Sequence, residues 1–310
     1  MLAWVTGASG FVARHLIPAL QADGLDVRGL GLEADVPPWL APARYATLDL
    51  GETAAVEREA RAQPPEAVVH LAGQSSAAAS FGEPELTFRQ NLGSALGLLE
   101  GLRRAGARPR LLLVSTSEVY GPQASAAPVA EDAPLNVVSP YGASKLAAET
   151  AGQAYARAYG LAVTVVRPFS HTGPGQDARF ALSSFARQIA LAERGAGPPR
   201  LLVGNLDVVR DYLDVRDVVD AYRLLLARAE AGTVYNIASG SGHRMRDLLG
   251  RLLALARVPL AVEADPARMR PQDLNFMVGA ADRLRRLGWS PRHPVDEALA
   301  GLLEWWRARI

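Results

Sequence analysis

A tyrosine and a lysine four residues apart are the two side chains in this sequence best suited to proton transfer. They are Tyr141 and Lys145, in the run Ser139-Pro140-Tyr141-Gly142-Ala143-Ser144-Lys145. A spacing of four places both side chains on one face of a helix. A free phenol has a pKa of about 10, and a fixed ammonium group beside it favours the phenolate and lowers that pKa. Tyr141 is therefore predicted to exchange a proton with an oxygen of a bound molecule.

The lysine is unusual in this composition. Of the 33 basic residues, Lys145 is the only Lys and the other 32 are Arg. Arg-rich codon usage with one Lys left by chance is the simple explanation. An Arg in place of Lys145 would, however, carry a planar, bulkier guanidinium, which is a poor match for a point contact with the hydroxyls of a bound ribose. A Tyr-x-x-x-Lys spacing arises easily by chance, but here it accompanies Thr116, a glycine-rich turn and this single Lys, so we interpret Lys145 as functional.

The glycine-rich turn lies near the start of the chain. It reads Thr6-Gly7-Ala8-Ser9-Gly10-Phe11-Val12-Ala13, between the apolar run Leu2–Thr6 and the helical pattern Phe11–Ala22. Glycines allow a tight turn and close backbone approach, and the free N–H groups at a helix start bind phosphate oxygens. A strand-turn-helix context strengthens an otherwise weak pattern. The turn predicts a dinucleotide pyrophosphate site, the alternative being a βα turn without a ligand.

The second strand leaves the choice of coenzyme open. An acid at its end serves the ribose hydroxyls of NAD, and a basic residue serves the extra phosphate of NADP. Glu33 is the candidate for NAD and Arg28 the candidate for NADP, although both also suit solvated surface positions. Asp49, after the third strand, is a candidate adenine-side contact or a helix cap.

The elements that must position these residues alternate between short apolar runs and longer helical patterns. This alternation predicts an α/β fold with a parallel sheet covered on both faces. The expected strands are Leu2–Thr6, Asp26–Gly29, Ala43–Leu48, Ala67–Leu71, Leu111–Ser115 and Ala162–Arg167. The expected helices are Phe11–Ala22, Pro84–Ala105, Tyr141–Tyr159 and Pro294–Arg309, and Ser139-Pro140 suits the cap and first turn of the third of them.

After Arg167 the sequence becomes rich in turns, which indicates a second, smaller lobe. We predict a Rossmann-type, doubly wound parallel sheet built from residues 1–168 and roughly 208–238. Residues 169–207 and 239–310 are then expected to form a C-terminal substrate-binding lobe.

Composition and charge exclude several classes of protein. A formal charge of +1 gives no general field for nucleic acid, and we expect none as a partner. No stretch reaches the roughly 20 apolar residues of a membrane helix, and no basic leader precedes the first apolar run, so neither a membrane span nor a signal peptide is expected. The chain has no Cys, which excludes disulfides, thiolate metal sites and cysteine nucleophiles, and we predict no metal.

Taken together, the motifs resemble those of extended short-chain dehydrogenases/reductases over almost the whole chain. The matching runs are Thr6–Ala13, His70-Leu71-Ala72-Gly73, Asn91, Ser115–Gly121 and Tyr141–Lys145. The resemblance implies that Thr116 is the catalytic hydroxyl partner, Tyr141 the acid/base and Lys145 the contact to the cofactor ribose. The implied NAD(P) site comprises Gly7, Ser9, Gly10, Phe11, Val12, Asp49, Leu50, Leu71, Ala72, Gly73, Tyr141, Lys145 and Pro168. Two positions depart from the family pattern, because Ala13 replaces a third glycine and Ala72-Gly73 replaces the commoner Ala-Ala.

Within this family the chain is more similar to the GDP-6-deoxy-4-keto-D-mannose reductases. The similarity runs through Arg167–Gln176, Gly204–Asp211, Asp214–Asp217, Val234–Gly240 and Arg270-Pro271. It implies reduction of the C4 ketone of GDP-4-keto-6-deoxy-D-mannose to GDP-D-rhamnose, with the proton supplied by Tyr141. The candidate substrate residues are Ser117, Ser170, Arg210 and Arg270, since guanidinium groups suit a diphosphate. Ser170 departs from the Asn usual at its position.

Three other functions remain open. GDP-mannose 4,6-dehydratase is the main rival, because Thr116-Ser117-Glu118 also matches its active-site run and Glu118 would remove the C5 proton. Against it, the turn at Gly173–Gln176 lacks the expected Arg-rich, Asn-containing stretch, and no basic cluster follows the second strand. A UDP- or dTDP-sugar epimerase or reductase would differ only in the base and sugar pockets. A noncatalytic NAD(P) sensor would not need Thr116, Tyr141 and Lys145 intact.

The resemblance also carries expectations about cofactor, assembly and location. The cofactor is expected to be NADP or NAD, with NADPH favoured. A homodimer is expected to form through the Pro84–Ala105 and Tyr141–Tyr159 helices. The expected location is the cytoplasm.

Overall fold

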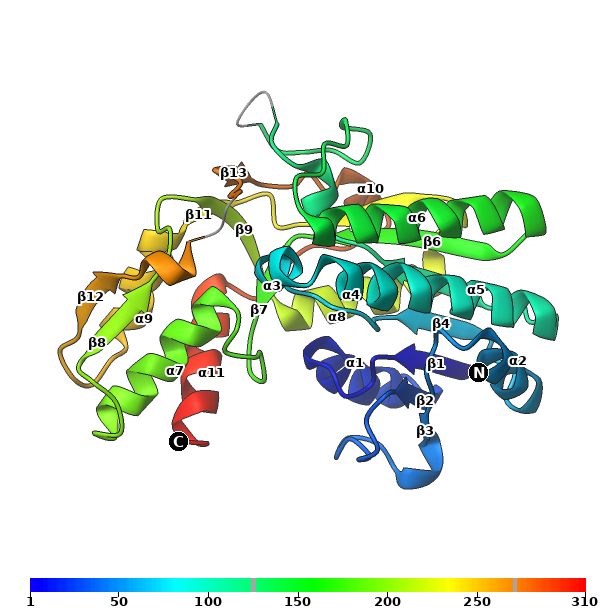
Figure 1. The fold of residues 1–310 in the computed structure, drawn as a ribbon, viewed down its shortest axis with the longest axis horizontal. Coiled ribbons are helices and arrows are strands. Elements are labelled where there is room, and N and C mark those ends of the chain that lie inside the picture. The colour runs from blue at the N-terminus through cyan, green and yellow to red at the C-terminus, as the bar shows by residue number, and fades with distance from the viewer. Residues whose placement is uncertain (124–126, 270–271) are drawn as a thin grey trace.

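Seven parallel strands form the central sheet of the larger lobe, on the right in Figure 1. The computed structural model describes residues 1–123, 127–269 and 272–310. The strand order is β3-β2-β1-β4-β5-β6-β10, and every neighbouring pair is parallel. The strands are β1 (Leu2–Thr6), β2 (Asp26–Gly31), β3 (Tyr45–Thr47), β4 (Ala67–His70), β5 (Arg110–Val114), β6 (Ala162–Pro168) and β10 (Val234–Ile237). This order is that of the doubly wound dinucleotide-binding fold, so the predicted fold class is confirmed.

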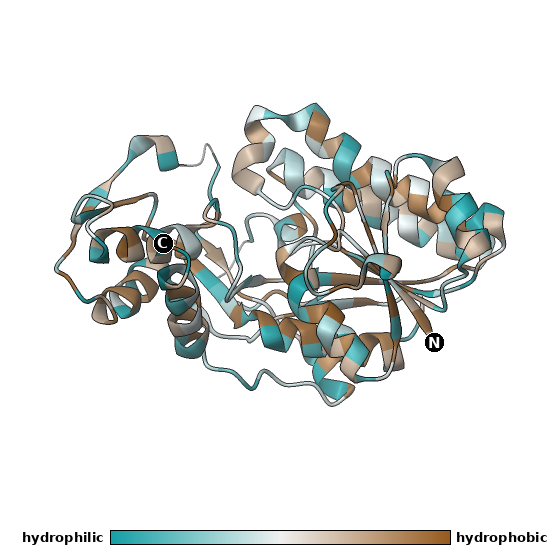
Figure 2. Ribbon diagram, turned by 90° about the horizontal axis from the view of Figure 1, so that it is seen from below, coloured by the Kyte–Doolittle hydropathy of each residue, from teal (hydrophilic) through white to brown (hydrophobic). Residues whose placement is uncertain are grey.

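Both faces of this sheet are buried, which explains the unbroken apolar runs in its strands. In β1, Ala3 and Val5 pack toward one face with α1 (Phe11–Ala22) and α8 (Val215–Arg228), whereas Trp4 packs toward the other. The second face is covered by α2 (Thr53–Ala62), α5 (Ser94–Ala105) and α6 (Pro140–Tyr159). Figure 2 shows hydrophobic residues, in brown, along the central strands.

The predicted helix from Pro84 to Ala105 is helical throughout but not uniform. It consists of α4 (Pro84–Phe88), a π-helical turn (Arg89–Gly93) and α5, and a short α3 (Ala77–Gly82) precedes it. A π-turn inserts an extra residue and often marks a functional site. Here the turn contains Asn91, whose side chain is buried.

The smaller lobe, on the left in Figure 1, has its own sheets and core. Its elements are β7 (Ser170–Thr172), α7 (Ala181–Glu193), β8 (Arg200–Val203), β9 (Val209–Asp214), β11 (Gly242–Arg244), α9 (Met245–Ala254), β12 (Ala261–Ala264), β13 (Phe276–Met277) and α11 (Val295–Arg307). Strand β9 pairs with β7, β11 and β13, and β12 pairs with β8. The chain then returns to the large sheet through α8 and β10, while α10 (Asp282–Arg286) packs beside β10. The lobe boundaries drawn from the sequence stay a prediction.

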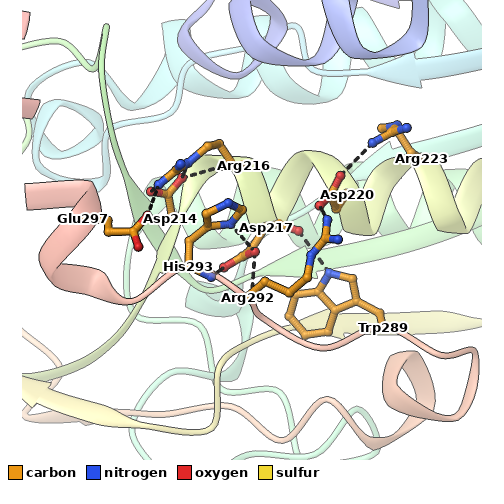
Figure 3. A network of polar contacts seen from close by, with 9 residues as sticks. All are labelled: Asp214, Arg216, Asp217, Asp220, Arg223, Trp289, Arg292, His293 and Glu297. Atoms are coloured by element: carbon orange, nitrogen blue, oxygen red, sulfur yellow. Dashed lines mark hydrogen bonds and ion pairs between the residues drawn. The ribbon is translucent and has the colours of Figure 1, made fainter. Parts of the chain in front are cut away.

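A network of polar contacts ties the start of α8 to the segment before α11 (Figure 3). The buried carboxylate of Asp217 accepts hydrogen bonds from the backbone N–H groups of Arg292 (3.0 Å) and His293 (3.1 Å), and the His293 ring lies 2.8 Å from it. The Asp217 carbonyl accepts from the Trp289 indole at 3.1 Å. The two lobes are therefore joined by directional contacts as well as by the chain. No helix among the described residues is both long and apolar enough to span a bilayer.

Candidate active site

Thr116, Tyr141 and Lys145 meet at the carboxyl end of β5. The Thr116 hydroxyl hydrogen-bonds to the Tyr141 phenol and also accepts from the Glu118 backbone N–H at 3.2 Å. The Lys145 ammonium donates to the Val114 carbonyl at 3.0 Å. All three side chains are buried. The structure thus brings together the three residues that the sequence separates by up to 29 positions.

Helix α6 presents the tyrosine because of how it begins. The Ser139 hydroxyl caps the helix by accepting from the Gly142 N–H at 3.0 Å, and Pro140 occupies the first turn, as predicted. A Cβ on Gly142 would lie 3.1 Å from the Glu118 carbonyl oxygen. A glycine after Tyr141 therefore lets the helix start pack directly on the turn that carries Glu118.

Burial dominates the electrostatics of this group. Burial raises the pKa of Tyr141 to about 12, the Thr116 hydrogen bond opposes this rise and the Glu118 charge adds to it. Burial also lowers the pKa of Lys145 to about 8. The expectation of a lowered pKa for Tyr141 is therefore wrong: desolvation of the phenolate is the largest cause of the shift, and the groups that act on the phenol are Thr116 and Glu118. Near neutral pH Tyr141 carries its proton, which is the form that can donate to a carbonyl oxygen.

A buried polar network supports the residue that precedes the catalytic threonine. Ser115 donates to a Glu149 carboxylate oxygen at 2.8 Å, and Arg167 forms an ion pair with the same carboxylate. Arg167 also donates to the Tyr120 hydroxyl at 3.0 Å, which donates to the Asn236 amide oxygen at 2.7 Å. The network joins α6, β5, β6 and β10 beneath the reacting groups.

The glycine-rich turn has the shape that a pyrophosphate requires. Gly7 has φ +65°, and a Cβ there would lie 2.9 Å from the Ala72 backbone. The Ala72 N–H donates to Thr6 Oγ1 at 3.1 Å, which holds the two loops together. Gly10 precedes α1 with no side-chain cap, so the first N–H groups of the helix receive no side-chain hydrogen bond there. Ala13, in place of a third glycine, is fully buried within the core that joins α1 to the sheet.

Asn91, whose buried amide oxygen lies next to this turn, was not predicted as a site residue from the sequence. Asn91 donates to Ser144 Oγ at 2.9 Å, and its Oδ1 is buried with no hydrogen-bond partner among the described residues. Gly73 has φ +135°, and a Cβ there would overlap this oxygen. Asn91 formed part of the family resemblance, but its role depends on the π-turn, which the sequence does not reveal. An unpaired acceptor beside Ala72 and Gly73 fits a donor supplied by a bound dinucleotide.

The adenosine side differs from expectation at one position. Arg28 forms an ion pair with Glu59 of α2 and donates to the Ala43 carbonyl at 3.3 Å. Arg28 is therefore held by Glu59 on the α2 face, which argues against the alternative in which it contacts NADP. Asp49 Oδ1 accepts from the Gly51 N–H at 2.8 Å, which shapes the turn before α2, and Leu50 is buried.

At the opposite end of the dinucleotide site, loops from both lobes converge. Pro168 ends β6, and the next strand, β7, carries Ser170 and His171. The His171 ring stacks on Phe11, with centroids 6.1 Å apart and planes at 10°. Ser117 is buried in the turn that follows Thr116. The two candidate substrate serines thus lie on different segments: Ser170 on β7, which adjoins the glycine turn, and Ser117 in the turn after Thr116. The cofactor candidate Leu71 directly follows β4 and precedes Ala72.

Of the two candidate diphosphate ligands, Arg210 lies on β9 and Arg270 lies outside the described residues. Arg210 forms an ion pair with Asp273 at 2.8 Å and donates to the Val209 carbonyl at 3.0 Å. Its neighbour Asp211 is fully buried and accepts from the backbone of Ser239, Gly240 and Gly279, which fixes this part of β9. No group of three or more His, Asp or Glu residues suited to a metal occurs in the described ranges.

A doubly wound sheet with an open glycine turn and a buried Thr-Tyr-Lys group at its carboxyl edge defines a nicotinamide-dependent oxidoreductase. The comparisons with known proteins make the class specific. Residues 3–238 match the model of the NAD dependent epimerase/dehydratase family, and the chain belongs to that family. Its cofactor is NAD(P).

Relatives resemble the chain over its whole length. The GDP-6-deoxy-D-mannose reductase of Pseudomonas aeruginosa is 38% identical over 99% of this chain and 97% of that protein. The solved structure of RMD from Pseudomonas aeruginosa complexed with NADPH matches with a TM-score of 0.88 and 37% identity, covering 100% and 99% of the two chains. The UDP-glucose 4-epimerase of Thermus thermophilus, solved in complex with NAD, matches with a TM-score of 0.91 and 30% identity, covering 100% of both chains.

Proposed function

We propose that this protein reduces the C4 ketone of GDP-4-keto-6-deoxy-D-mannose to GDP-D-rhamnose with NAD(P)H, in deoxysugar biosynthesis. The observation that carries the reaction type is the buried group of Thr116, Tyr141 and Lys145 at the carboxyl end of β5, in which the Tyr141 phenol adjoins the Thr116 hydroxyl. A reductase needs a proton donor at the carbonyl oxygen, and this phenol keeps its proton near neutral pH. The choice of sugar is supported by 38% identity over almost the full length of a reductase of that kind.

The chain's own residues account for the proton half of the reaction. When bound, the reduced nicotinamide supplies a hydride to C4. Tyr141 donates its proton to O4, so the ketone becomes an alcohol and one hydride and one proton are consumed. Thr116 shares a hydrogen bond with the phenol and suits the same oxygen. Lys145 holds its ammonium on the Val114 carbonyl and keeps two further donors for ribose hydroxyls.

Coenzyme absorbance on mixing with the ketosugar tests this proposal. The protein is mixed with NADH or NADPH and freshly made GDP-4-keto-6-deoxy-D-mannose, beside a control that contains GDP-mannose. Rapid oxidation of the coenzyme is expected with the ketosugar and not with GDP-mannose. No oxidation there would refute the reductase, and the same assay with UDP- and dTDP-linked ketosugars, together with competition by free GDP, UDP and dTDP, tests the base.

A second candidate, GDP-mannose 4,6-dehydratase, is favoured by one observation. Glu118 lies in the turn that directly follows Thr116, and its negative charge raises the pKa of Tyr141, so a carboxylate accompanies the Thr116-Tyr141-Lys145 group. A dehydratase would convert GDP-mannose to the ketosugar without net coenzyme consumption, and Glu118→Gln would abolish that conversion. For the reductase, Glu118→Gln is expected to leave ketosugar reduction within about tenfold of the parent, because no carbon-bound proton is removed.

We also infer a homodimer. An apolar groove of about 590 Å³ runs between the π-turn, α5 and α6, lined by Leu92, Leu96, Val137, Leu146, Ala147 and Ala154 among others. Leu96 is 38% exposed on this face. A second copy of the chain is the proposed occupant, because a two-fold pairing of the same helices would cover both grooves. Sedimentation at several concentrations tests it, with Leu96→Glu expected to give monomer and Leu255→Glu, at an exposed leucine on the smaller lobe, expected to remain dimeric.

The proposal places the reaction in the cytoplasm, where nicotinamide coenzymes and nucleotide sugars are available.

A further inference from the structure

Two arginines that form no ion pair with a carboxylate among the described residues lie against tryptophan rings, one of them within α1. The Arg14 guanidinium carbon lies 5.4 Å from the ring centroid of Trp39 and 5.9 Å from that of Trp305. The Arg309 guanidinium carbon lies 4.1 Å from the Trp305 centroid. We call these four residues the arginine-tryptophan cluster.

The cluster carries positive charge that no carboxylate in the described ranges neutralises through an ion pair. Within the part of the chain that the structure describes, the Arg14 side chain forms no hydrogen bond or ion pair, and that of Arg309 donates only to the Trp305 carbonyl, at 3.3 Å. Burial lowers the pKa of Arg14, and the neighbouring Arg309 charge lowers it further. Many other arginines of this chain pair with a carboxylate, as Arg223 does with Asp23. Two unpaired like charges at one place are stabilised when an anion binds between them.

The position of the cluster indicates which part of a ligand it would meet. The Trp39 indole N–H donates to the Ala8 carbonyl, in the glycine-rich turn, at 2.9 Å. Trp39 belongs to the segment that follows β2, and Arg14 lies one turn into α1. In doubly wound folds the end of β2 and the glycine turn enclose the adenosine ribose of the coenzyme. The cluster therefore borders the ribose end of the dinucleotide site.

The last residue of β2 is consistent with an anion at that place. NAD-specific sites put a carboxylate near here, which would repel a phosphate. In this chain β2 ends at Gly31, which has no side chain. The exposed Glu33 is the competing group, since one of its carboxylate oxygens lies 2.9 Å from where a Gly31 Cβ would be.

The smaller lobe completes the cluster from the other side. Trp305 belongs to α11 and Arg309 follows that helix, so two of the four residues come from the last turns of the chain. Gly175, with φ +95°, approaches Arg14 so closely that a Cβ would lie 3.1 Å from Arg14 Cδ. Arg14 is thus held between the lobes by shape and not by a counter-charge.

We propose that Arg14, with support from Arg309, binds the 2′-phosphate of NADP(H) and makes this protein prefer NADPH. The inference rests on the cofactor use described above but not on the identity of the sugar. Trp39 and Trp305 hold the Arg14 guanidinium by cation-π contact and leave its N–H groups for the phosphate.

Binding of adenosine 2′,5′-bisphosphate and of 5′-AMP, followed by calorimetry on the full chain, tests the proposal, because the two probes differ only in the 2′-phosphate. The parent protein is expected to bind the bisphosphate on the order of tenfold more tightly or better. Arg14→Ala is expected to remove this preference and to leave 5′-AMP binding unchanged. Arg108→Ala is the matched control, because this exposed arginine precedes β5 at the amino end of the strands, away from the coenzyme. It should keep the preference for the bisphosphate.

Equal binding of the two probes by the parent protein would overturn the proposal. So would an undiminished preference in Arg14→Ala, whose folding is checked by circular dichroism, with Arg14→Lys as a variant that keeps the charge. A loss of 5′-AMP binding in Glu33→Gln would instead assign an NAD site. Ketosugar reduction with NADH as the preferred coenzyme would refute this inference while leaving the proposed function intact.

Discussion

Replacing Glu149 with Gln is expected to destabilise the folded chain by about 3 kcal/mol. Glu149 and Arg167 are 2% and 4% exposed, and Ser115 donates to the same carboxylate. Removing one partner of a buried ion pair costs roughly 3–5 kcal/mol, because the remaining charge stays buried and unpaired. Gln keeps the shape and one acceptor for Arg167, so the lower end of that range applies. This loss is a large share of the roughly 5–15 kcal/mol that keeps a typical domain folded.

Urea unfolding followed by circular dichroism, with midpoint and slope compared between variants, measures the effect. Glu85→Gln is the matched control, because the Arg89–Glu85 pair is 72% and 86% exposed and should change stability by under about 0.5 kcal/mol. A Glu149→Leu/Arg167→Met double variant should recover much of the loss, since no buried charge remains. A loss below about 1 kcal/mol for Glu149→Gln, with an unchanged slope, would refute the reasoning that this pair is desolvated and coupled.

Three further outcomes follow from the site. Tyr141→Phe is expected to lower kcat for ketosugar reduction by roughly 10²- to 10⁴-fold without weakening coenzyme binding. Tyr159→Phe, at an exposed tyrosine, should match the parent, and comparable kcat values for the two variants would contradict the role of Tyr141 as proton donor. Gly7→Ala is expected to abolish NADPH binding measured by fluorescence, because its φ of +65° and its 2.9 Å approach to the Ala72 backbone exclude a side chain; normal binding would show that the turn does not hold the pyrophosphate. Burial lowers the pKa of Lys145 from 10.5 to about 8, so between these values the unfolded chain binds more protons and stability rises with pH. From about pH 7 to about pH 9.5 the parent should therefore gain about 2 kcal/mol relative to Lys145→Met in urea unfolding, and parallel pH profiles would disprove the buried-lysine argument.

Elements with strong local signals were predictable from the sequence. The bounds of β1 and α1 match the prediction to the residue, because a fully buried strand, a glycine turn and an amphipathic helix follow one another directly. The seventh strand, β10, was not among the expected strands, since a four-residue run such as Val234–Ile237 is placed in the sheet only by its pairing with β6.

The chemistry of the site was predictable where it depended on spacing and not where it depended on burial. The spacing of four placed Tyr141 and Lys145 together, but the direction of the Tyr141 pKa shift follows from desolvation by neighbours distant in sequence. The role of Arg28 was left open for the same reason, because its partner Glu59 lies on a helix 31 residues later. The arginine-tryptophan cluster could not be predicted from the sequence, because no basic run follows the second strand. The fold instead brings Arg14 together with Trp305 and Arg309 from the end of the chain.

The return of the chain to the large sheet through β10 has a consequence for protein engineering. Strand β10 completes the sheet only after the smaller lobe has contributed β7, β8 and β9, and that lobe resumes with β11. The two lobes are therefore interleaved along the gene and cannot be exchanged as a single cassette. A chimaera designed to recognise another sugar would have to replace at least two separate segments, on either side of α8 and β10, and leave those two elements with their native sheet.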